Sequence, residues 1–235
     1  MNIPGTVLLS GIVGSVAYGL NHEGSDVDRL GVFAAPTERW HGLNPPTIND
    51  LTWTSDSKPD VVMHEALKMV TLLLACNPSV TELLWLPDGL YETRTTLGDD
   101  LIRARCCFLS AGKVRDSYLR YAERQFARLE ARGDGSFSSD TRKRTAKHAR
   151  HLWRLVQQGI YLHMSGALSV RLSDEQAADC REFGELVAAG HLDVARAYLA
   201  RSSRRFDEHG SALAEYPTRE AAEAWLQRVR REFYR

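Results

Sequence analysis

The stretch GSVAYGLNHEGSDVDRLGVF (14–33) combines a glycine-serine turn with two aspartates that are separated by one residue. The apolar run VLLSGIV (7–13) precedes it and predicts a short buried strand that ends at the turn. Ser15 is expected to begin a short helix, which Gly19 ends. DVDRLGVF (26–33) then predicts a second strand. The sequence therefore places a turn and an aspartate pair close together.

The aspartate pair suggests a metal site. Residues two apart in a strand point to the same face, so Asp26 and Asp28 are expected side by side. Such carboxylates repel unless a cation neutralises them, and Mg²⁺ accepts carboxylates together with phosphate oxygens. A third carboxylate would complete a two-metal site of the kind that serves phosphoryl transfer. Asp60, which opens the predicted strand PDVVMH (59–64), is the candidate, and Glu65 is the alternative.

The glycine-serine pair can supply contacts to phosphate. Glycine lets the backbone approach a ligand closely, and amides at a helix start and a seryl hydroxyl bind phosphate oxygens. Gly14 and Ser15 are therefore expected to hold a triphosphate whose α-phosphate lies over the metal ions. Each motif alone is common in turns, but the ordered combination of strand, turn and paired aspartates is rarer.

This arrangement resembles the polymerase beta-type nucleotidyltransferase superfamily, whose members share Gly-Ser or Gly-Gly, then Asp-x-Asp, and later a third acid. The resemblance implies an α/β fold with a mixed sheet and helices, and transfer of an NMP from an NTP to a hydroxyl with release of pyrophosphate. It also implies that Asp26, Asp28 and Asp60 are catalytic and bind two Mg²⁺ ions, for which Mn²⁺ can substitute. Gly14 and Ser15 would bind the nucleotide.

Three longer stretches resemble a bacterial and phage branch of that superfamily, some members of which are linked with RNA repair. They are GSVAYGLNHEGSDVDRLGVFAAP (14–36), DVVMHEALKMVTLLLACNPSVTELLWLP (60–87) and AKHARHLWRLVQQGIYLHMSGALSVRLS (146–173). The closer resemblance implies that the acceptor is the end of an RNA, such as a tRNA-like molecule. It leaves the preferred NTP, the number of nucleotides added and the oligomeric state open.

The pattern along the chain predicts two domains. Beyond Gly98 the apolar residues recur at helical spacing in four segments: 99–131, 141–165, 174–201 and 218–235. The natural boundary lies near residue 97. We therefore expect a nucleotidyltransferase catalytic domain over residues 1–97, followed by an all-helical domain over residues 98–235.

Charge is balanced in total, with 30 basic and 30 acidic residues, but not along the chain. Residues 1–100 hold 5 Lys or Arg and 13 Asp or Glu, a net charge of −8. Residues 101–155 hold 14 and 5, a net charge of +9. A basic segment suits a phosphate-rich partner such as an RNA backbone, although solvated helix surfaces are also often rich in arginine.

One predicted helix concentrates these basic groups. Lys147, Arg150, His151 and Arg154 stand at i, i+3, i+4 and i+7, which predicts a single helical face. Arginine forms forked contacts to phosphate and lysine supplies a point charge. We therefore expect Lys147, His151 and Arg154 to bind the nucleotide, and the face to close over the triphosphate or the acceptor.

Composition excludes several other classes. The sequence holds no run of about 18 apolar residues, as a membrane span would need, and its start lacks the basic flank of a signal peptide. We therefore expect no membrane partner and a cytoplasmic location. The four cysteines show no C-x-x-C spacing and the histidines form no zinc motif, so the thiols are expected to be reduced and structural.

Other functions remain open from the sequence. The acceptor could be a small molecule, as in antibiotic-modifying enzymes, or a protein, because acceptor contacts lie on variable loops. A catalytically silent, nucleotide-binding regulator is a different class, although all three carboxylates are in place. A purely structural helical protein would leave the stretch 14–33 unexplained.

Overall fold

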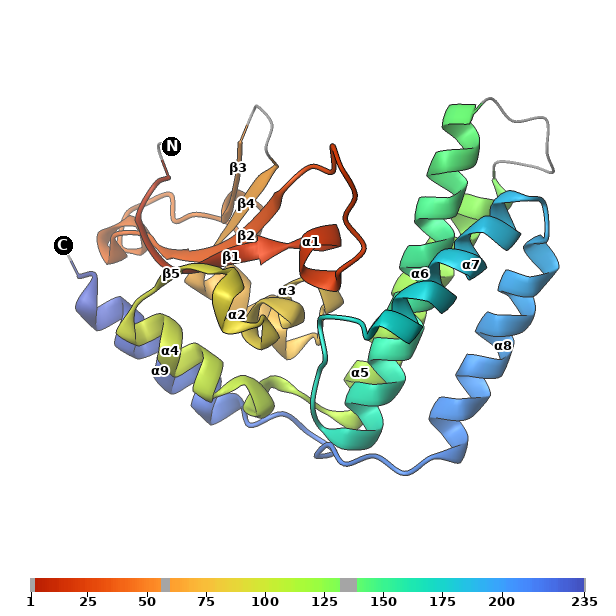
Figure 1. Cartoon of the computed structure of the whole chain (residues 1–235). Helices are drawn as coiled ribbons and strands as arrows, with labels where there is room; N and C mark the ends of the chain where they lie inside the picture. Colours follow the sequence, from red (N-terminus) through yellow and green to blue (C-terminus); the bar gives the residue numbers. More distant parts are fainter. Residues whose placement is uncertain (1–2, 56–59, 132–138, 235) are drawn as a thin grey trace. The chain divides into compact units, whose positions relative to one another are not determined.

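The computed structural model describes residues 3–55, 60–131 and 139–234, and the chain forms two compact units (Figure 1). The first unit comprises Met1–Leu109 and Tyr216–Arg235, and the second is Ser110–Glu215. The division after Leu109 differs from the boundary that the sequence predicted near residue 97. The last helix also belongs to the first unit, because it packs against other helices of that unit.

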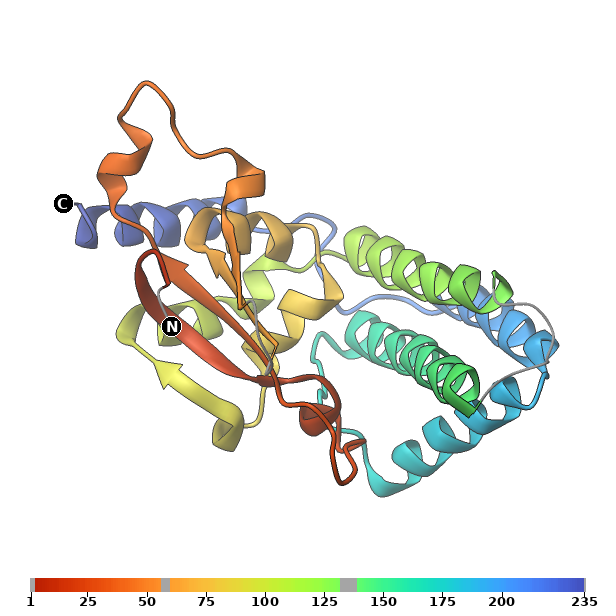
Figure 2. The same ribbon diagram turned by 90° about the horizontal axis from the view of Figure 1, so that it is seen from above.

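The first unit contains a mixed sheet with the strand order β3-β4-β2-β1-β5 (Figures 1 and 2). Its strands are β1 (Thr6–Val13), β2 (Asp28–Ala34), β3 (Thr52–Thr54), β4 (Val61–Glu65) and β5 (Tyr91–Arg94). β1 runs antiparallel to β2 and β5, β4 runs antiparallel to β3, and β2 and β4 are parallel. The three strands that the sequence predicted correspond to β1, β2 and β4, whereas the short edge strand β3 was not expected.

Helices accompany the sheet in the same unit. They are α1 (Gly14–Tyr18), α2 (Ala66–Leu74), α3 (Pro78–Thr81), α4 (Thr96–Arg103) and α9 (Arg219–Glu232). Short 3-10 helices are η1 (Thr37–Trp40), η2 (Ile48–Asp50), η3 (Glu82–Trp85), η4 (Asp88–Leu90) and η5 (Arg105–Phe108). Figure 1 shows α2, α4 and α9 on one side of the sheet.

Alternation along the central strands decides where the core lies. Leu30 and Val32 share a face of β2 with Asp28, and Leu9 stands opposite Val32 on β1. All three apolar side chains are buried, and Gly98 of α4 packs directly against Leu9. The same pleat that buries this apolar face therefore carries Asp28 at its end, where β2 begins.

The second unit is made of helices α5 (Ala111–Glu130), α6 (Ser139–Ser165), α7 (Asp174–Ala188) and α8 (Leu192–Glu208). α6 packs against the other three, and Figures 1 and 2 show α5 and α6 side by side. Glycine permits two close approaches: Gly159 of α6 lies against the Tyr118 ring, and Gly184 of α7 lies against the Arg150 side chain. A larger residue at either position would push the helices apart.

Within the described residues, no single helix is long and apolar enough to cross a membrane. One bent pair of helices, Ala66–Leu74 with Pro78–Trp85, has the length and the apolar composition of a membrane span, and these two criteria alone single it out. The four cysteines are free thiols. Cys76 and Cys180 are buried, as expected for structural thiols, whereas Cys106 is exposed. Burial raises the pKa of the Cys180 thiol to about 11, so this thiol stays protonated at neutral pH.

An ion pair attaches the last helix to the sheet. Arg230 of α9 donates from Nη1 and Nη2 to the two carboxylate oxygens of Glu65, at 2.6 and 2.9 Å, and its guanidinium stacks on Trp40. The Glu65 side chain is fully buried and also caps α2 by accepting from the Leu67 amide. Trp225 adds a hydrogen bond to the Leu97 carbonyl. The chain terminus is thus part of the first unit's core.

We expect Arg230→Met to reduce the free energy of unfolding by about 3–5 kcal/mol, because it leaves a buried, unpaired carboxylate at Glu65. Urea unfolding followed by circular dichroism measures the change. Arg231→Met is the matched control, since Arg231 is exposed and its loss should cost less than about 0.5 kcal/mol. Equal stability of the two variants would contradict this assignment.

Candidate active site

The turn after β1 brings backbone and carboxylate together. β1 ends at Val13, which pairs with Asp28 at the start of β2. Gly14 follows with φ of +69°, a left-handed conformation that favours glycine. A Cβ at Gly14 would overlap Oδ2 of Asp28, so this carboxylate lies directly against the Gly14 backbone, next to Ser15. The glycine-serine turn and the second aspartate are therefore neighbours, as the sequence predicted.

Asp26 does not share the strand face of Asp28, which corrects the sequence prediction. The strand begins at Asp28, and Asp26 lies exposed in the preceding loop. The reason is that β1 ends at Val13, so no strand remains to pair with residues before Asp28. A turn at His22–Ser25, closed by hydrogen bonds in both directions, occupies that loop. Asp26 still stands only two residues from Asp28.

Asp60 lies at the same end of the sheet as Asp28, where β2 and β4 begin. β2 and β4 are parallel with Arg29 opposite Val61, and the Arg29 amide donates to the Asp60 carbonyl at 2.9 Å. This register places Asp60 beside Asp28, because each precedes its paired neighbour by one residue. Asp60 is exposed and Asp28 is half-buried. The structure thus brings two of the three predicted carboxylates to adjacent strand starts.

Glu65, the alternative third carboxylate, is already bonded to other groups of the protein. Both of its oxygens accept hydrogen bonds, from the Arg230 guanidinium and the Leu67 amide. It stands at the opposite end of β4 from Asp60, and its side chain is fully buried. A carboxylate already paired in this way is not open to a metal ion, so Asp60 is the better candidate.

The three candidate carboxylates have the right chemistry for a hard divalent cation, but their positions in the structure do not yet form a metal site. Asp26, Asp28 and Asp60 offer the oxygen donors that Mg²⁺ prefers. Over the ranges that the structure describes, however, no three carboxylate, imidazole or thiol groups stand close enough to hold one metal ion. A site built from these residues therefore needs Asp26 or Asp60 to approach Asp28, which their exposed positions permit.

Sequence reasoning missed Glu82, which holds the helix after the glycine-serine turn in place. Tyr18 of α1 donates its hydroxyl hydrogen bond to the Glu82 carboxylate, with both oxygens at 2.9 Å. Glu82 belongs to η3 and is buried. The signal in the sequence was a single acid within the apolar run SVTELLWL (79–86). This contact ties the short helix that follows Gly14 to the core.

Of the predicted nucleotide-binding residues on α6, Arg154 is buried within the protein. Its Nη1 donates to Gln158 Oε1 at 2.5 Å and its Nη2 donates to His151 Nδ1 at 3.1 Å. The side-chain amide of Gln158 donates in turn to the carbonyls of Ser169 and Val170. The expectation of one exposed basic face is wrong for Arg154, because packing surrounds this part of α6 on nearly all sides.

His151 is a neutral group at physiological pH. Desolvation, followed by the charges of Arg154, His148, Arg128 and Lys147, lowers its pKa to about 3. Because Arg154 can only donate, Nδ1 accepts and the proton of the neutral ring lies on Nε2. His151 therefore supplies no positive charge to a phosphate, and only Lys147 of the three predicted ligands is exposed.

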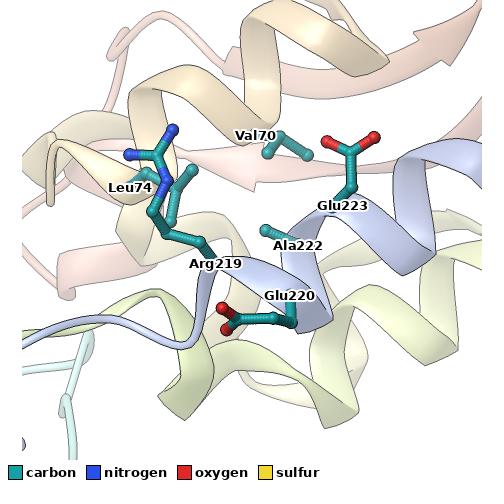
Figure 3. A pocket seen from close by; sticks show the side chains of 6 residues that line it. All are labelled: Val70, Leu74, Arg219, Glu220, Ala222 and Glu223. Atoms are coloured by element: carbon teal, nitrogen blue, oxygen red, sulfur yellow. The ribbon is translucent and has the colours of Figure 1, made fainter.

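A surface pocket of about 310 Å³ lies between α2 and α9 (Figure 3). Its lining residues are Val70, Leu74, Arg219, Glu220, Ala222 and Glu223. Figure 3 shows the two carboxylates pointing to different sides of the α9 helix. None of the residues assigned to nucleotide or metal lines this pocket, so it adds no group to the candidate site.

Residues 3–197 match the sequence model of a family described as RlaP, the RNA repair pathway DNA polymerase beta family. The chain belongs to this family. The match covers the whole sheet, the α1 turn and helices α5 to α7, and it ends within α8. No curated protein matches the chain.

Membership in the RlaP family makes the protein a polymerase beta-type nucleotidyltransferase of an RNA repair pathway. The predicted fold class is confirmed: a mixed sheet with helices is followed by a helical region. The polymerase beta family generally uses a divalent metal, and the RlaP description implies a nucleotide and RNA as substrates. The α9 helix lies outside the matched residues although it completes the first unit.

We expect Gly14→Ala to destabilise the protein more than Gly24→Ala. Both glycines have positive φ, +69° and +82°, so each alanine should cost at least about 1 kcal/mol of backbone strain. A Cβ at Gly24 meets no atom within 4 Å, whereas one at Gly14 displaces the Asp28 carboxylate. Urea unfolding gives the two costs. Equal values would show that Asp28 does not rest on Gly14.

The lowered pKa of His151 predicts a pH dependence of stability. Between about pH 3 and 6.5 the unfolded chain binds a proton at His151 that the folded chain does not. The free energy of unfolding should therefore fall as the pH falls through this range, and His151→Gln should flatten the decline. Urea unfolding at several pH values tests this. His191→Gln, at an exposed position, is the control and should keep the wild-type slope.

Proposed function

We propose that the protein transfers an NMP from an NTP to a hydroxyl at the end of an RNA and releases pyrophosphate. The observation that supports this best is the contact between the Asp28 carboxylate and the Gly14 backbone, with Asp60 on the neighbouring strand. Gly14 and Ser15 would bind the triphosphate through backbone amides and the Ser15 hydroxyl. A phosphate held there lies within reach of Asp28.

In this reaction the acceptor hydroxyl oxygen forms a bond to the α-phosphorus. The bond between the α-phosphorus and the oxygen that bridges to the β-phosphate breaks, and its electron pair leaves with pyrophosphate. The hydroxyl proton needs a base, and Asp60 is our candidate because it is exposed beside Asp28. The assignment accounts for the difference between a half-buried Asp28 and a solvent-accessible Asp60.

Asp26 and Asp28 would hold the divalent ions, with Asp60 as the third ligand. Bound Mg²⁺ supplies positive charge that offsets the charge developing on the phosphate oxygens. The chain's own part is to orient the carboxylates: the β1–β2 pairing places Asp28, and the β2–β4 pairing places Asp60. Asp26 reaches the site from a loop, so it can adjust to the ion.

An RNA acceptor is the proposal that the family description and the charge distribution favour together. The description places the family in an RNA repair pathway. Residues 101–155 hold 14 Lys or Arg against 5 Asp or Glu, and much of this segment forms α5 and α6 of the second unit. A basic surface attracts a phosphate backbone without regard to its sequence.

We expect Asp26→Asn and Asp28→Asn each to lower NMP transfer by at least about a hundredfold, because each removes a charge that the transition state needs. Asp60→Asn should cost a similar factor through loss of the base. The assay offers Mg²⁺ and each α-labelled NTP in turn, with total RNA as the acceptor or with the protein alone. Label in RNA identifies both the acceptor class and the preferred base.

Asp88→Asn is the matched control for this assay, since Asp88 is an exposed carboxylate of the same unit that pairs with Arg94. It should transfer at the wild-type rate. Unchanged transfer by Asp28→Asn would refute the site. NTP binding without label in RNA would redirect the search to small-molecule or protein acceptors, or to a silent regulator.

A further inference from the structure

A row of exposed arginines marks one side of α5. Arg124 and Arg128 are four residues apart, so they lie on the same side of the helix about 6 Å apart along its axis. Arg124 also lies over the Tyr121 ring, at 5.5 Å from its centroid. Neither arginine has an acidic residue at three or four positions along the described part of α5.

The neighbouring helix adds a cation at the same place. α5 and α6 run antiparallel, and His148 bonds to Gln125 across their interface at 2.8 Å. This contact joins the residue after Arg124 to the residue after Lys147. Arg128 and Lys147 also both lie close enough to His151 to act on its charge. Together, Arg124, Arg128 and Lys147 form what we call the α5–α6 basic surface.

Two of the three acidic residues of α5 form ion pairs away from this surface, and the third, Glu123, is exposed and precedes Arg124 in the chain. Asp116 pairs with Arg115, and Glu130 pairs with Arg196 of α8 at 3.0 Å. Within residues 60–131 and 139–234, by contrast, the three cations of the α5–α6 basic surface form no ion pair with a carboxylate. Cations that are held side by side without a carboxylate partner repel one another unless an external anion neutralises them.

We infer that the α5–α6 basic surface binds the phosphodiester backbone of the single-stranded acceptor end of an RNA. An axial step of about 6 Å between Arg124 and Arg128 suits successive phosphates better than one compact anion. Guanidinium planes and Tyr121 also offer stacking surfaces for unpaired bases. The inference rests on the proposed function, since it names where that function holds its acceptor.

This assigns Lys147 to RNA and not to the triphosphate. His151 is neutral and Arg154 is buried in its bonds to Gln158 and His151, so the predicted triphosphate-binding face is reduced to one exposed cation. The residue after Lys147, His148, contacts Gln125, which stands between Arg124 and Arg128 on α5. Loss of Lys147 should therefore affect RNA binding and leave the KM for NTP unchanged.

The test is the affinity of the full chain for a short, unstructured, fluorescently labelled RNA, measured by anisotropy between about 50 and 200 mM salt. The triple variant Arg124→Ala/Arg128→Ala/Lys147→Ala should bind at least about tenfold more weakly at low salt. The slope of log K against log salt should shrink by about 2, since each single-strand phosphate contact contributes about 0.7. In the transfer assay the KM for RNA should rise and that for NTP should not.

Two further variants make the result specific. Arg201→Ala/Arg205→Ala removes two exposed arginines with the same four-residue spacing on α8 and should leave affinity and slope unchanged. Arg124→Lys/Arg128→Lys keeps the charges and should retain the slope, which separates loss of charge from damage to the helix.

The outcomes separate this inference from the proposed function. If the wild type labels RNA and the triple variant binds RNA as well as the wild type does, the surface is wrong and the function stands. An equal loss in the α8 control pair would also overturn the surface. If the wild type neither binds nor labels RNA, the RNA acceptor itself fails, and label appearing in protein would identify a polypeptide acceptor instead.

Discussion

The contact between a backbone and a carboxylate at the end of β1 is the constraint on which the candidate site depends. Gly14 adopts a left-handed conformation and leaves room for Asp28, which pairs with Val13 at the first position of β2. Any side chain at Gly14 would meet that carboxylate and strain the turn. The parallel pairing of β2 with β4 then adds Asp60 at the same edge. The end of β1 and the starts of β2 and β4 meet there because the strand register aligns them.

Two buried acids that are not candidate metal ligands, Glu82 and Glu65, hold neighbouring helices of the first unit in place. Glu82 accepts from Tyr18 and so ties down the helix that follows Gly14. Glu65 accepts from Arg230 and so ties α9 to the sheet. Buried carboxylates are costly unless they are paired, which makes each contact sensitive to the loss of its partner. The first unit therefore depends on its last helix, although the family match ends before it.

The sequence predicted most elements and the closeness of Asp28 to the glycine-serine turn, and the differences from the structure have physical causes. Asp26 was expected in the strand, but β1 is too short to pair with it, and strand length depends on a partner. Arg154 was expected on an exposed face, yet it is buried because α6 packs against three other helices. The spacing of residues along one helix does not show how many other helices pack around it. The predicted boundary near residue 97 differs from the division after Leu109, and α9 returns to the first unit from the far end of the chain. Each difference concerns contacts between distant segments.

The sequence by itself predicted chemistry on phosphate and metal, because a glycine-serine turn, closely spaced aspartates and a basic helical segment rarely occur together in that order. Local spacing also predicted the strands and helices, since hydrophobic periodicity is a local property. Only the tertiary structure decided that Asp60 stands beside Asp28, that Glu65 is committed to Arg230, and that His151 is neutral. Register, burial and the charges around a side chain come from residues far along the chain, and they exist only once the chain has folded.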